Sequence, residues 1–337
     1  MMSTMRASLF VALCFLAACG GDDGSPVQEE GHWQLLGEGR PSSLLAVWSS
    51  GVDNVWIVGG REGAGAGPTV LHYDGTAWTK LDTGMVNVDL WQVFGFADGT
   101  VFLGGSNGTI LRYRNNTFEK LTTPSTDIVF GLWGSSPDDV WAVGGQTTGR
   151  PFIWRYQGTA FTSVPGIPAG ITTGAVWKVT GRAADDVWMS ASQGYVLHWD
   201  GQTLSNEMIG GNDESLFSIG CTAELCLTAG TNGSNGVLYE NSGAGWSSKV
   251  PTEDGPVWRG VTPAGDDPYI VGQFGAVARR GTGKYITEKH ALTSESLHSA
   301  WVDDDGNLFA VGGKFDRALT IDGVVIFKGT IDLPVLP

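Results

Sequence analysis

The sequence predicts an all-β fold: a β-propeller of about seven four-stranded antiparallel blades, with six or eight blades left open as alternatives. Three observations support this prediction. One motif recurs along the chain, alternating apolar and polar segments are split by turn signals, and the mature chain shows no convincing helical period. The predicted propeller covers residues 32–337 and follows an N-terminal signal peptide and a flexible tether.

The recurring motif is clearest as WSSGVDNVWIVGG at residues 48–60 and WGSSPDDVWAVGG at residues 133–145. Weaker copies begin near residues 91, 179, 218, 261 and 301. The copies recur about every 42 residues, which matches one propeller blade and exceeds most helical repeat units.

A second half follows the glycines of each motif, as in TVLHYDGTAWTKL at residues 69–81 and TILRYRNNTFEKL at residues 109–121. These are alternating strands split by tight-turn signals, a pattern typical of hairpins. Each unit therefore reads as strand, Asp turn, strand, Gly loop, strand, turn, strand. Units arranged radially cover one another's faces and protect most sheet edges.

Closing the ring requires a strand from the far end of the chain. The segment HWQLL at residues 32–36 resembles the predicted fourth strand at residues 77–81, so we expect it to complete the last blade beside residues 318–322. Residues 324–331 are an alternative candidate for that fourth strand.

Pairs of aromatic residues eight positions apart mark the first two strands of several units. Their repetition at one register favours packing between blades over a sugar-stacking platform. The pairs are Trp48/Trp56, Phe94/Phe102, Trp133/Trp141 and Trp301/Phe309.

The motif resembles the W-G-S-x-x-D-D-V-W-A-V-G repeats of bacterial exported propellers in the BNR/Asp-box-like or photosystem-assembly-factor-like superfamily. The resemblance covers nearly the whole mature chain. It departs from a true Asp-box, because no residue separates Asp74 from Gly75. It implies a propeller fold and little about chemistry.

The N-terminus indicates export. Arg6 precedes the short apolar run LFVALCF, and the following Leu-Ala-Ala-Cys-Gly segment resembles the bacterial lipobox with Cys19 as the lipidated residue. We expect a lipoprotein signal peptide at residues 1–18, and the lipidated cysteine with a flexible tether at residues 19–31. An ordinary signal peptide is the alternative. The predicted location is the cell envelope, with the body anchored to a membrane and either periplasmic or surface-facing at the outer membrane.

Two cysteines remain in the body after Cys14 leaves with the signal peptide and Cys19 is used by the anchor. Cys221 and Cys226 are five residues apart, and an oxidising compartment favours a disulfide between them. Two free thiols or a weak metal pair are the alternatives.

The formal net charge of −15 argues against nucleic acid as a partner. No metal or cofactor is expected, because the histidines lack metal-ligand spacing. His72 and His198 occupy the same position in two repeats, and we expect this position to lie on a solvent-exposed strand face. The D-x-D-G-N spacing at residues 303–307 hints at calcium, but a structural turn is favoured. We expect a monomer.

No catalytic motif occurs, so the sequence favours a non-catalytic binding or scaffold propeller for an envelope protein or a glycan. A glycan-active enzyme of sialidase or glycosidase type is the alternative. It would need an arginine cluster, for which Arg61, Arg150 and Arg317 are candidates. A purely structural envelope component is a third possibility.

The candidate binding face carries the loops that follow the glycines of each motif. Polar groups project from these loops at Arg61, Asn107, Gln146, Arg150, Gln193, Gln273, Lys314 and Arg317.

Overall fold

The computed structural model describes residues 31–146, 150–249, 255–262, 268–281, 284–303, 305–314 and 322–337. The predicted signal peptide, Cys19 and Arg317 lie outside the described residues. In the described part of the chain, no helix is long and apolar enough to cross a membrane.

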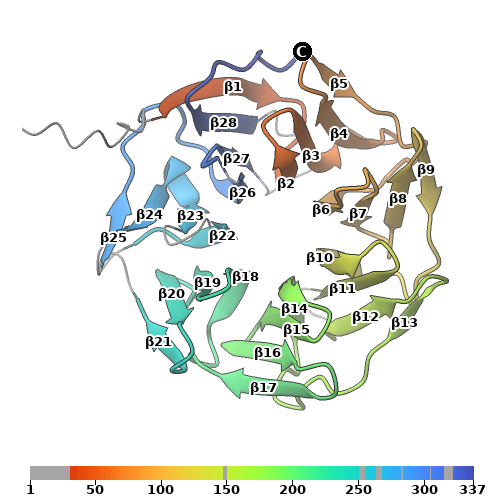
Figure 1. Ribbon diagram of the computed structural model, residues 1–337, viewed down its shortest axis with the longest axis vertical. Coiled ribbons are helices and arrows are strands. Elements are labelled where there is room, and N and C mark those ends of the chain that lie inside the picture. The colour runs from red at the N-terminus through yellow and green to blue at the C-terminus, as the bar shows by residue number, and fades with distance from the viewer. Residues whose placement is uncertain are drawn as a thin grey trace, which may run out of the picture. The chain divides into compact units, whose positions relative to one another are not determined.

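The described residues form seven four-stranded antiparallel blades arranged in a ring (Figure 1), as predicted. Blade 1 contains β2 (Leu44–Gly51), β3 (Asn54–Arg61), β4 (Pro68–Tyr73) and β5 (Trp78–Lys80). Blade 2 contains β6 (Leu90–Gly95), β7 (Val101–Gly105), β8 (Ile110–Arg114) and β9 (Thr117–Lys120). Blade 3 contains β10 (Ile128–Ser136), β11 (Asp139–Gln146), β12 (Phe152–Tyr156) and β13 (Phe161–Ser163).

Blades 4 to 6 repeat the same order. Blade 4 contains β14 (Gly174–Ala183), β15 (Asp186–Ala191), β16 (Tyr195–Trp199) and β17 (Leu204–Met208). Blade 5 contains β18 (Ser215–Cys221), β19 (Cys226–Thr231), β20 (Gly236–Asn241) and β21 (Trp246–Ser248). Blade 6 contains β22 (Trp258–Thr262), β23 (Tyr269–Gly272), β24 (Val277–Gly281) and β25 (Lys284–Thr287), with a short 3-10 turn, η1 (Gln273–Gly275), between β23 and β24. A short β11–β14 contact joins blades 3 and 4 into one sheet.

Blade 7 closes the ring with both ends of the chain. It contains β26 (Leu297–Val302), β27 (Leu308–Gly312), β28 (Gly323–Gly329) and, as its outermost strand, β1 (His32–Arg40). The expected use of the N-terminal segment is confirmed, but its partner differs. β1 pairs with β28, with His32 opposite Gly329 and Leu35 opposite Ile326. Reading residues 324–331 as the fourth strand is therefore wrong, because β28 is the third.

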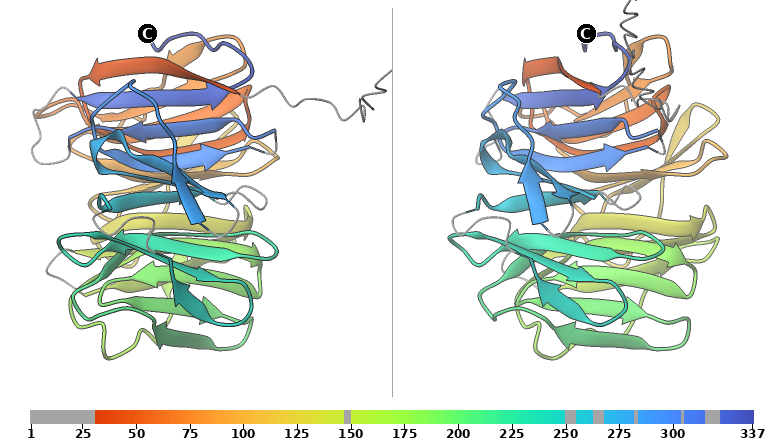
Figure 2. Two further views of the ribbon diagram at one scale, coloured as in Figure 1. Left: turned by 90° about the vertical axis from the view of Figure 1, so that its left-hand side faces the viewer. Right: turned by 60° about the vertical axis from the view of Figure 1, so that its left-hand side comes forward.

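The strands run between two faces of the ring, as the side views show (Figure 2). Each innermost strand starts at the face that carries the loops between second and third strands and the connections between blades. We call this the connection face. The opposite face carries the turns after first and third strands, and we call it the turn face. This division follows from the antiparallel order within each blade.

The paired aromatics pack between blades, as expected. Trp133 lies directly opposite Trp141 across the β10–β11 turn, and Trp48 lies opposite Trp56. The second member of each pair is fully buried in a core between two blades: Trp141, for example, packs with Val179 and Leu197 of blade 4.

The shared His/Arg position is not the solvated strand face that the sequence suggested. His198 stacks on Trp188 with ring centroids 3.9 Å apart, and its Nε2 lies 2.7 Å from Asp186 Oδ1. The side chain at this position therefore packs on the neighbouring tryptophan and connects the third strand to the residue after the Asp turn. The same three-part contact recurs in His72–Trp56–Asn54 and in Arg155–Trp141–Asp139.

The turn at residues 303–307 engages its own backbone. Asp303 Oδ1 accepts hydrogen bonds from the backbone N–H groups of Asp305 and Asn307, and Asp303 Oδ2 accepts one from the Asn307 amide. These bonds satisfy the bend as Asp turns usually do.

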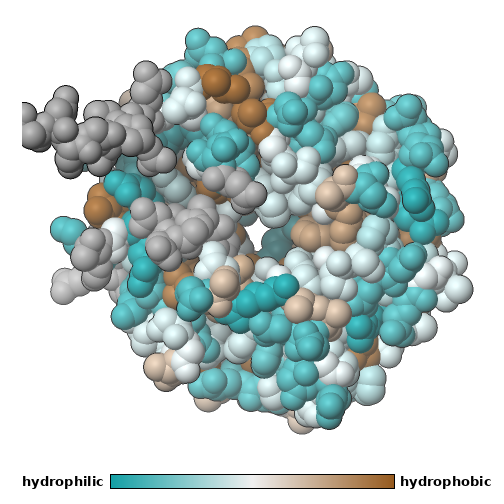
Figure 3. Space-filling view, viewed as in Figure 1, coloured by the Kyte–Doolittle hydropathy of each residue, from teal (hydrophilic) through white to brown (hydrophobic). Residues whose placement is uncertain are grey.

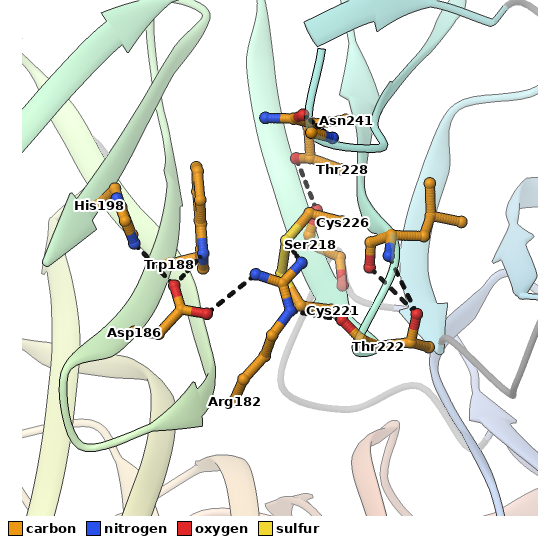
Figure 4. The surroundings of a disulfide bond; sticks show 12 residues. Arg182, Asp186, Trp188, His198, Ser218, Cys221, Thr222, Cys226, Thr228 and Asn241 are labelled. Carbon is orange, nitrogen blue, oxygen red and sulfur yellow. Dashed lines mark hydrogen bonds and ion pairs between the residues drawn. A yellow bond between two sulfur atoms is a disulfide. The ribbon is translucent and has the colours of Figure 1, made fainter. Parts of the chain in front are cut away.

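The predicted disulfide between Cys221 and Cys226 is present and joins β18 to β19 (Figure 4). Arg182 of blade 4 lies against it, with Nη2 3.3 Å from Cys226 Sγ and Nη1 2.9 Å from Asp186 Oδ2. The disulfide therefore fixes a hairpin at the boundary between blades 4 and 5.

Ring closure generates a prediction. Leu36 of β1 is fully buried between blades 7 and 1, together with Val325, Phe327 and Leu44. Leu36→Ala should lower the free energy of unfolding by about 2–5 kcal/mol, because it removes apolar contacts from this core. Urea denaturation measures the change. Glu38→Ala, an exposed position on the same strand, is the control and should change stability by about 0.5 kcal/mol or less. Equal midpoints for the two variants would show that β1 does not seal the ring.

Candidate functional site

Every innermost strand carries a β-bulge near its start at the connection face. In β2 the pairing register shifts between Leu44 and Ala46, which leaves Leu45 at the bulge. In β6 it shifts between Leu90 and Gln92, which leaves Trp91 at the bulge. A bulge leaves a residue unpaired and redirects its side chain. The residues at the bulges of the seven blades are Leu45, Trp91, Phe130, Trp177, Phe217, Arg259 and His298.

These seven side chains line one cavity of about 420 Å³, together with Lys178 and Ser215. Because each comes from near the start of an innermost strand, the cavity occupies the connection-face end of the central channel. The opening at the centre of the ring is visible in Figure 3. The volume falls within the range of small-ligand sites, about 300–1,000 Å³.

Four aromatic rings form a continuous arc around the cavity. Trp91 and Phe130 have centroids 4.9 Å apart, Phe130 and Trp177 5.0 Å, and Trp177 and Phe217 5.2 Å. The guanidinium of Arg259 continues the arc, 4.7 Å from the centre of the Phe217 ring. Five consecutive blades thus supply one wall of side chains, in which neighbouring rings meet edge-to-face or at a tilt.

Three basic side chains complete the lining. Burial lowers the pKa of Lys178 to about 7, and its Nζ donates a hydrogen bond to Gln92 Oε1. Burial also lowers the pKa of Arg259, and its Nε has no hydrogen-bond partner in the part of the chain that the structure describes. Burial lowers the pKa of His298 to about 4, and the positive charges of Arg259 and Lys178 act in the same direction. His298 Nε2 donates to the Gly313 carbonyl at 2.7 Å.

A second cavity of about 250 Å³ lies deeper in the channel. Its walls include Phe94, Trp133 and Trp301, the first members of three of the four aromatic pairs, and Lys178 lines both cavities. Among the described residues, none that lines either cavity is an aspartate or a glutamate. These walls therefore offer no pair of carboxylates for glycoside hydrolysis.

The polar residues proposed from the sequence lie on the connection face, outside the cavity lining. Arg61 donates from its backbone N and from Nη1 to the Asp89 carboxylate, both at 2.9 Å, and Gln146 Nε2 donates to Asp127 Oδ1 at 2.9 Å. Asp89 directly precedes β6, so Arg61 of blade 1 bonds to the connection into blade 2. Asp127 directly precedes β10, so Gln146 bonds to the connection that enters its own blade.

The remaining proposed residues have comparable positions. Lys314 Nζ lies 3.3 Å from Asp322 Oδ2, Gln193 Oε1 accepts from the Thr172 N–H, and Asn107 Nδ2 lies 3.4 Å from the Asn87 carbonyl oxygen. Gln273 donates its backbone N–H to Val257 O, and Arg150 is exposed just before β12. Several of the side chains predicted from the sequence therefore bond to loops of the connection face, and their role in binding stays a prediction.

The sequence analysis missed the bulged residues. They sit three positions before the first aromatic marker, as Trp91 precedes Phe94 and Phe130 precedes Trp133. That spacing could have been used as a signal in the sequence. The bulge could not be predicted, because it depends on how two strands pair, and an unpaired residue changes the face on which a side chain lies.

Phe274 is a second missed residue. It is 77% exposed and has φ 61°, a conformation that a bulky side chain rarely adopts. Asn107 and Gln193 occupy the same left-handed position in blades 2 and 4, each followed by glycine. Phe274 therefore presents an exposed aromatic ring on the connection face, in a backbone conformation that is costly for its side chain.

His298 predicts a dependence of stability on pH. The unfolded chain binds a proton at this histidine below about pH 6.5, whereas the folded chain binds it only near pH 4. Stability should therefore fall as pH decreases from 6.5 to 4. His298→Gln should reduce the loss between pH 7 and pH 4.5 by about 2 kcal/mol.

Urea unfolding at pH 7, 5.5 and 4.5 measures this effect. Lys178 does not interfere, because its lowered pKa changes stability only between about pH 7 and its ordinary value of 10.5. An unaltered pH slope in His298→Gln would contradict the assignment.

Solved structures of propellers resemble this chain closely in fold and distantly in sequence. The WD40 β-propeller domain of Doa1 aligns with a TM-score of 0.65 and 12% identity, covering 88% of this chain and 96% of that one. YCF48 bound to D1 peptide gives 0.63 and 12%, covering 89% and 97%. YCF48 from Cyanidioschyzon merolae gives 0.64 and 14%, covering 88% and 98%. No family model and no curated protein matches the chain. The likeness confirms the propeller fold that the repeats implied.

Proposed function

We propose that this chain is an exported lipoprotein, tethered at the cell envelope through Cys19, whose propeller binds a protein or peptide partner without catalysis. The observation that carries the proposal is the cavity lined by one bulged side chain from each of the seven blades. A ring of side chains that no single blade could assemble makes a specific receptor for a group inserted from the connection face.

The composition of the site favours binding. Aromatic and arginine side chains dominate energetic hot spots, and the arc from Trp91 to Arg259 supplies both kinds in a preorganised wall. Phe274 adds an exposed aromatic on the same face. The enzyme alternative has less support, because the described walls of the channel lack the carboxylates that glycoside hydrolysis needs.

A propeller of similar architecture supports the choice of partner. YCF48 has been solved with a D1 peptide bound. At 12% identity this likeness concerns architecture. It shows that a propeller of this form can take a peptide, and our proposal extends that capacity to the connection face of this chain.

The anchor is proposed from the sequence. The lipobox-like segment ends at Cys19, and β1 begins at His32, the residue at which the predicted body starts. An acyl-modified cysteine followed by an acidic, glycine-rich leash would keep the folded body beside a membrane.

Removing the anchor should therefore release the protein. Cys19→Ala is expected to move it from the membrane fraction to the soluble fraction, because the lipidated thiol supplies the attachment. Cell fractionation with immunoblotting measures the distribution, and Cys14→Ala is the matched control. Membrane association that persists in Cys19→Ala would remove the lipoprotein proposal.

Partner binding should depend on the connection face. Phe274→Asn replaces the exposed ring with a residue that accepts a left-handed conformation, so the fold should be maintained while capture weakens. Trp177→Ala opens the aromatic arc of the cavity. Each change is expected to weaken binding by about 2 kcal/mol, roughly 30-fold.

The measurement is quantitative capture of proteins from solubilised envelope by the wild-type chain and its variants. Ile331→Asn is the control, because Ile331 is an exposed apolar residue two positions after β28, which ends at the turn face. Undiminished capture by both Phe274→Asn and Trp177→Ala, with folding verified by circular dichroism, would place binding elsewhere.

A further inference from the structure

We propose that the channel cavity is a carboxylate site: it takes a ligand whose apolar body lies against the aromatic arc and whose carboxylate binds Arg259, with Lys178 as a second cation. This inference rests on the proposed binding function and specifies the chemistry of its ligand.

The first argument is an imbalance of charge inside the channel. The chain has 35 acidic residues and 20 lysines and arginines, so carboxylates are in excess. On the outer strands cations have acidic partners, as in Arg155–Asp139 at 2.6 Å and Arg280–Glu240 at 2.8 Å. Among the described residues lining the two channel cavities, however, none is acidic, although Lys178 and Arg259 are both present. An anionic ligand would supply the missing counter-charge.

The second argument is the state of Arg259. Its guanidinium is held over the Phe217 ring at 4.7 Å, and its Nε is buried without a hydrogen-bond partner among the described residues. A buried donor left unsatisfied is costly, and this partly buried cation also has no acidic residue beside it in the described lining of the cavity. The N–H groups of a guanidinium can donate to both oxygens of a carboxylate. A bound carboxylate would therefore supply Arg259 with both a hydrogen-bond acceptor and a negative charge.

The third argument is the proximity of the positive charges. Lys178 comes from β14 of blade 4 and Arg259 from β22 of blade 6, and both line the same cavity. His298 experiences both charges, since each contributes to lowering its pKa. The field of these groups therefore converges on one volume, which favours an anion and disfavours an amine.

The fourth argument is the shape and polarity of the remaining wall. Leu45 and the four arc aromatics present apolar surface beside the cations, within a cavity of about 420 Å³. A hydrated inorganic anion would leave that surface unused. A carboxylate joined to an aromatic or aliphatic body would use both parts. Such a group can come from a small organic acid or from the last residue of a polypeptide.

The test compares acids with their amides on the folded full chain. Isothermal titration calorimetry measures the affinity of N-acetylphenylalanine and of N-acetylphenylalaninamide, which differ only in the carboxylate. Two matched decapeptides ending in phenylalanine, one with a free terminus and one amidated, form the second arm. We expect the acid to bind at least about tenfold more tightly than the amide in one arm or both. The arm with the higher affinity identifies the source of the carboxylate.

Variants then assign the preference to the proposed cations. Arg259→Gln should abolish the acid–amide difference, and Lys178→Gln should reduce it, with the weak amide binding unchanged. Arg114→Gln removes an exposed cation at the end of β8 and should leave the difference intact. Equal affinities for acid and amide in the wild type, or no binding of any probe at millimolar concentration, would overturn the inference. So would a full preference in a folded Arg259→Gln variant.

The outcomes separate this inference from the proposed function. Equal acid and amide affinities, with envelope capture still lost in Trp177→Ala, would reject the carboxylate site and keep the binding propeller. An Arg259-dependent preference for the acid, with capture unaffected by Phe274→Asn and Trp177→Ala, would keep the site and reject partner binding at this face.

Discussion

The structure depends on the pairing of the first strand with the last. A four-stranded sheet exposes two faces and two edges, and each blade here relies on its neighbours to cover them. β1 supplies the outer strand of blade 7, which otherwise has only the three strands at the end of the chain. Leu36 then fills the boundary between blades 7 and 1, and the C-terminal residues add Leu333 and Leu336 to the same core. Because the ring is continuous, the seven innermost strands are held at a common radius around one channel.

The predictability of this fold follows from repetition. Trp141 and Trp56 could be assigned to the core from sequence, because aromatic residues recur at one register and the Asp turns recur beside them. The closing strand could be recognised by likeness to other fourth strands. The strand that pairs with it could not be predicted, because residues 318–322 and 324–331 both looked like strands in the sequence. The structure pairs β1 with β28 and places Leu35 opposite Ile326.

The residues that line the channel cavity could not be predicted from the sequence. Loop variation directed attention to the loops of the connection face and to Arg61 and Gln146, whose side chains bond to connections between blades. Trp91 and Arg259 belong to innermost strands whose sequences give no sign that these two side chains face the channel. They reach the channel through bulges, and a bulge depends on how two strands pair, which a single strand's sequence does not reveal. The solvated reading of His72 was wrong for a related reason, since the stacking partner Trp56 lies on the adjacent strand.

The position of β1 also separates the start of the first strand from the channel cavity. As the fourth strand of its blade, β1 runs antiparallel to β28, from the turn face towards the connection face (Figure 2). The chain thus enters the ring at His32 on the turn face. The seven bulged residues that line the cavity lie near the starts of the innermost strands, on the connection face. A group that enters the cavity therefore approaches the ring from the side opposite the first residue of β1.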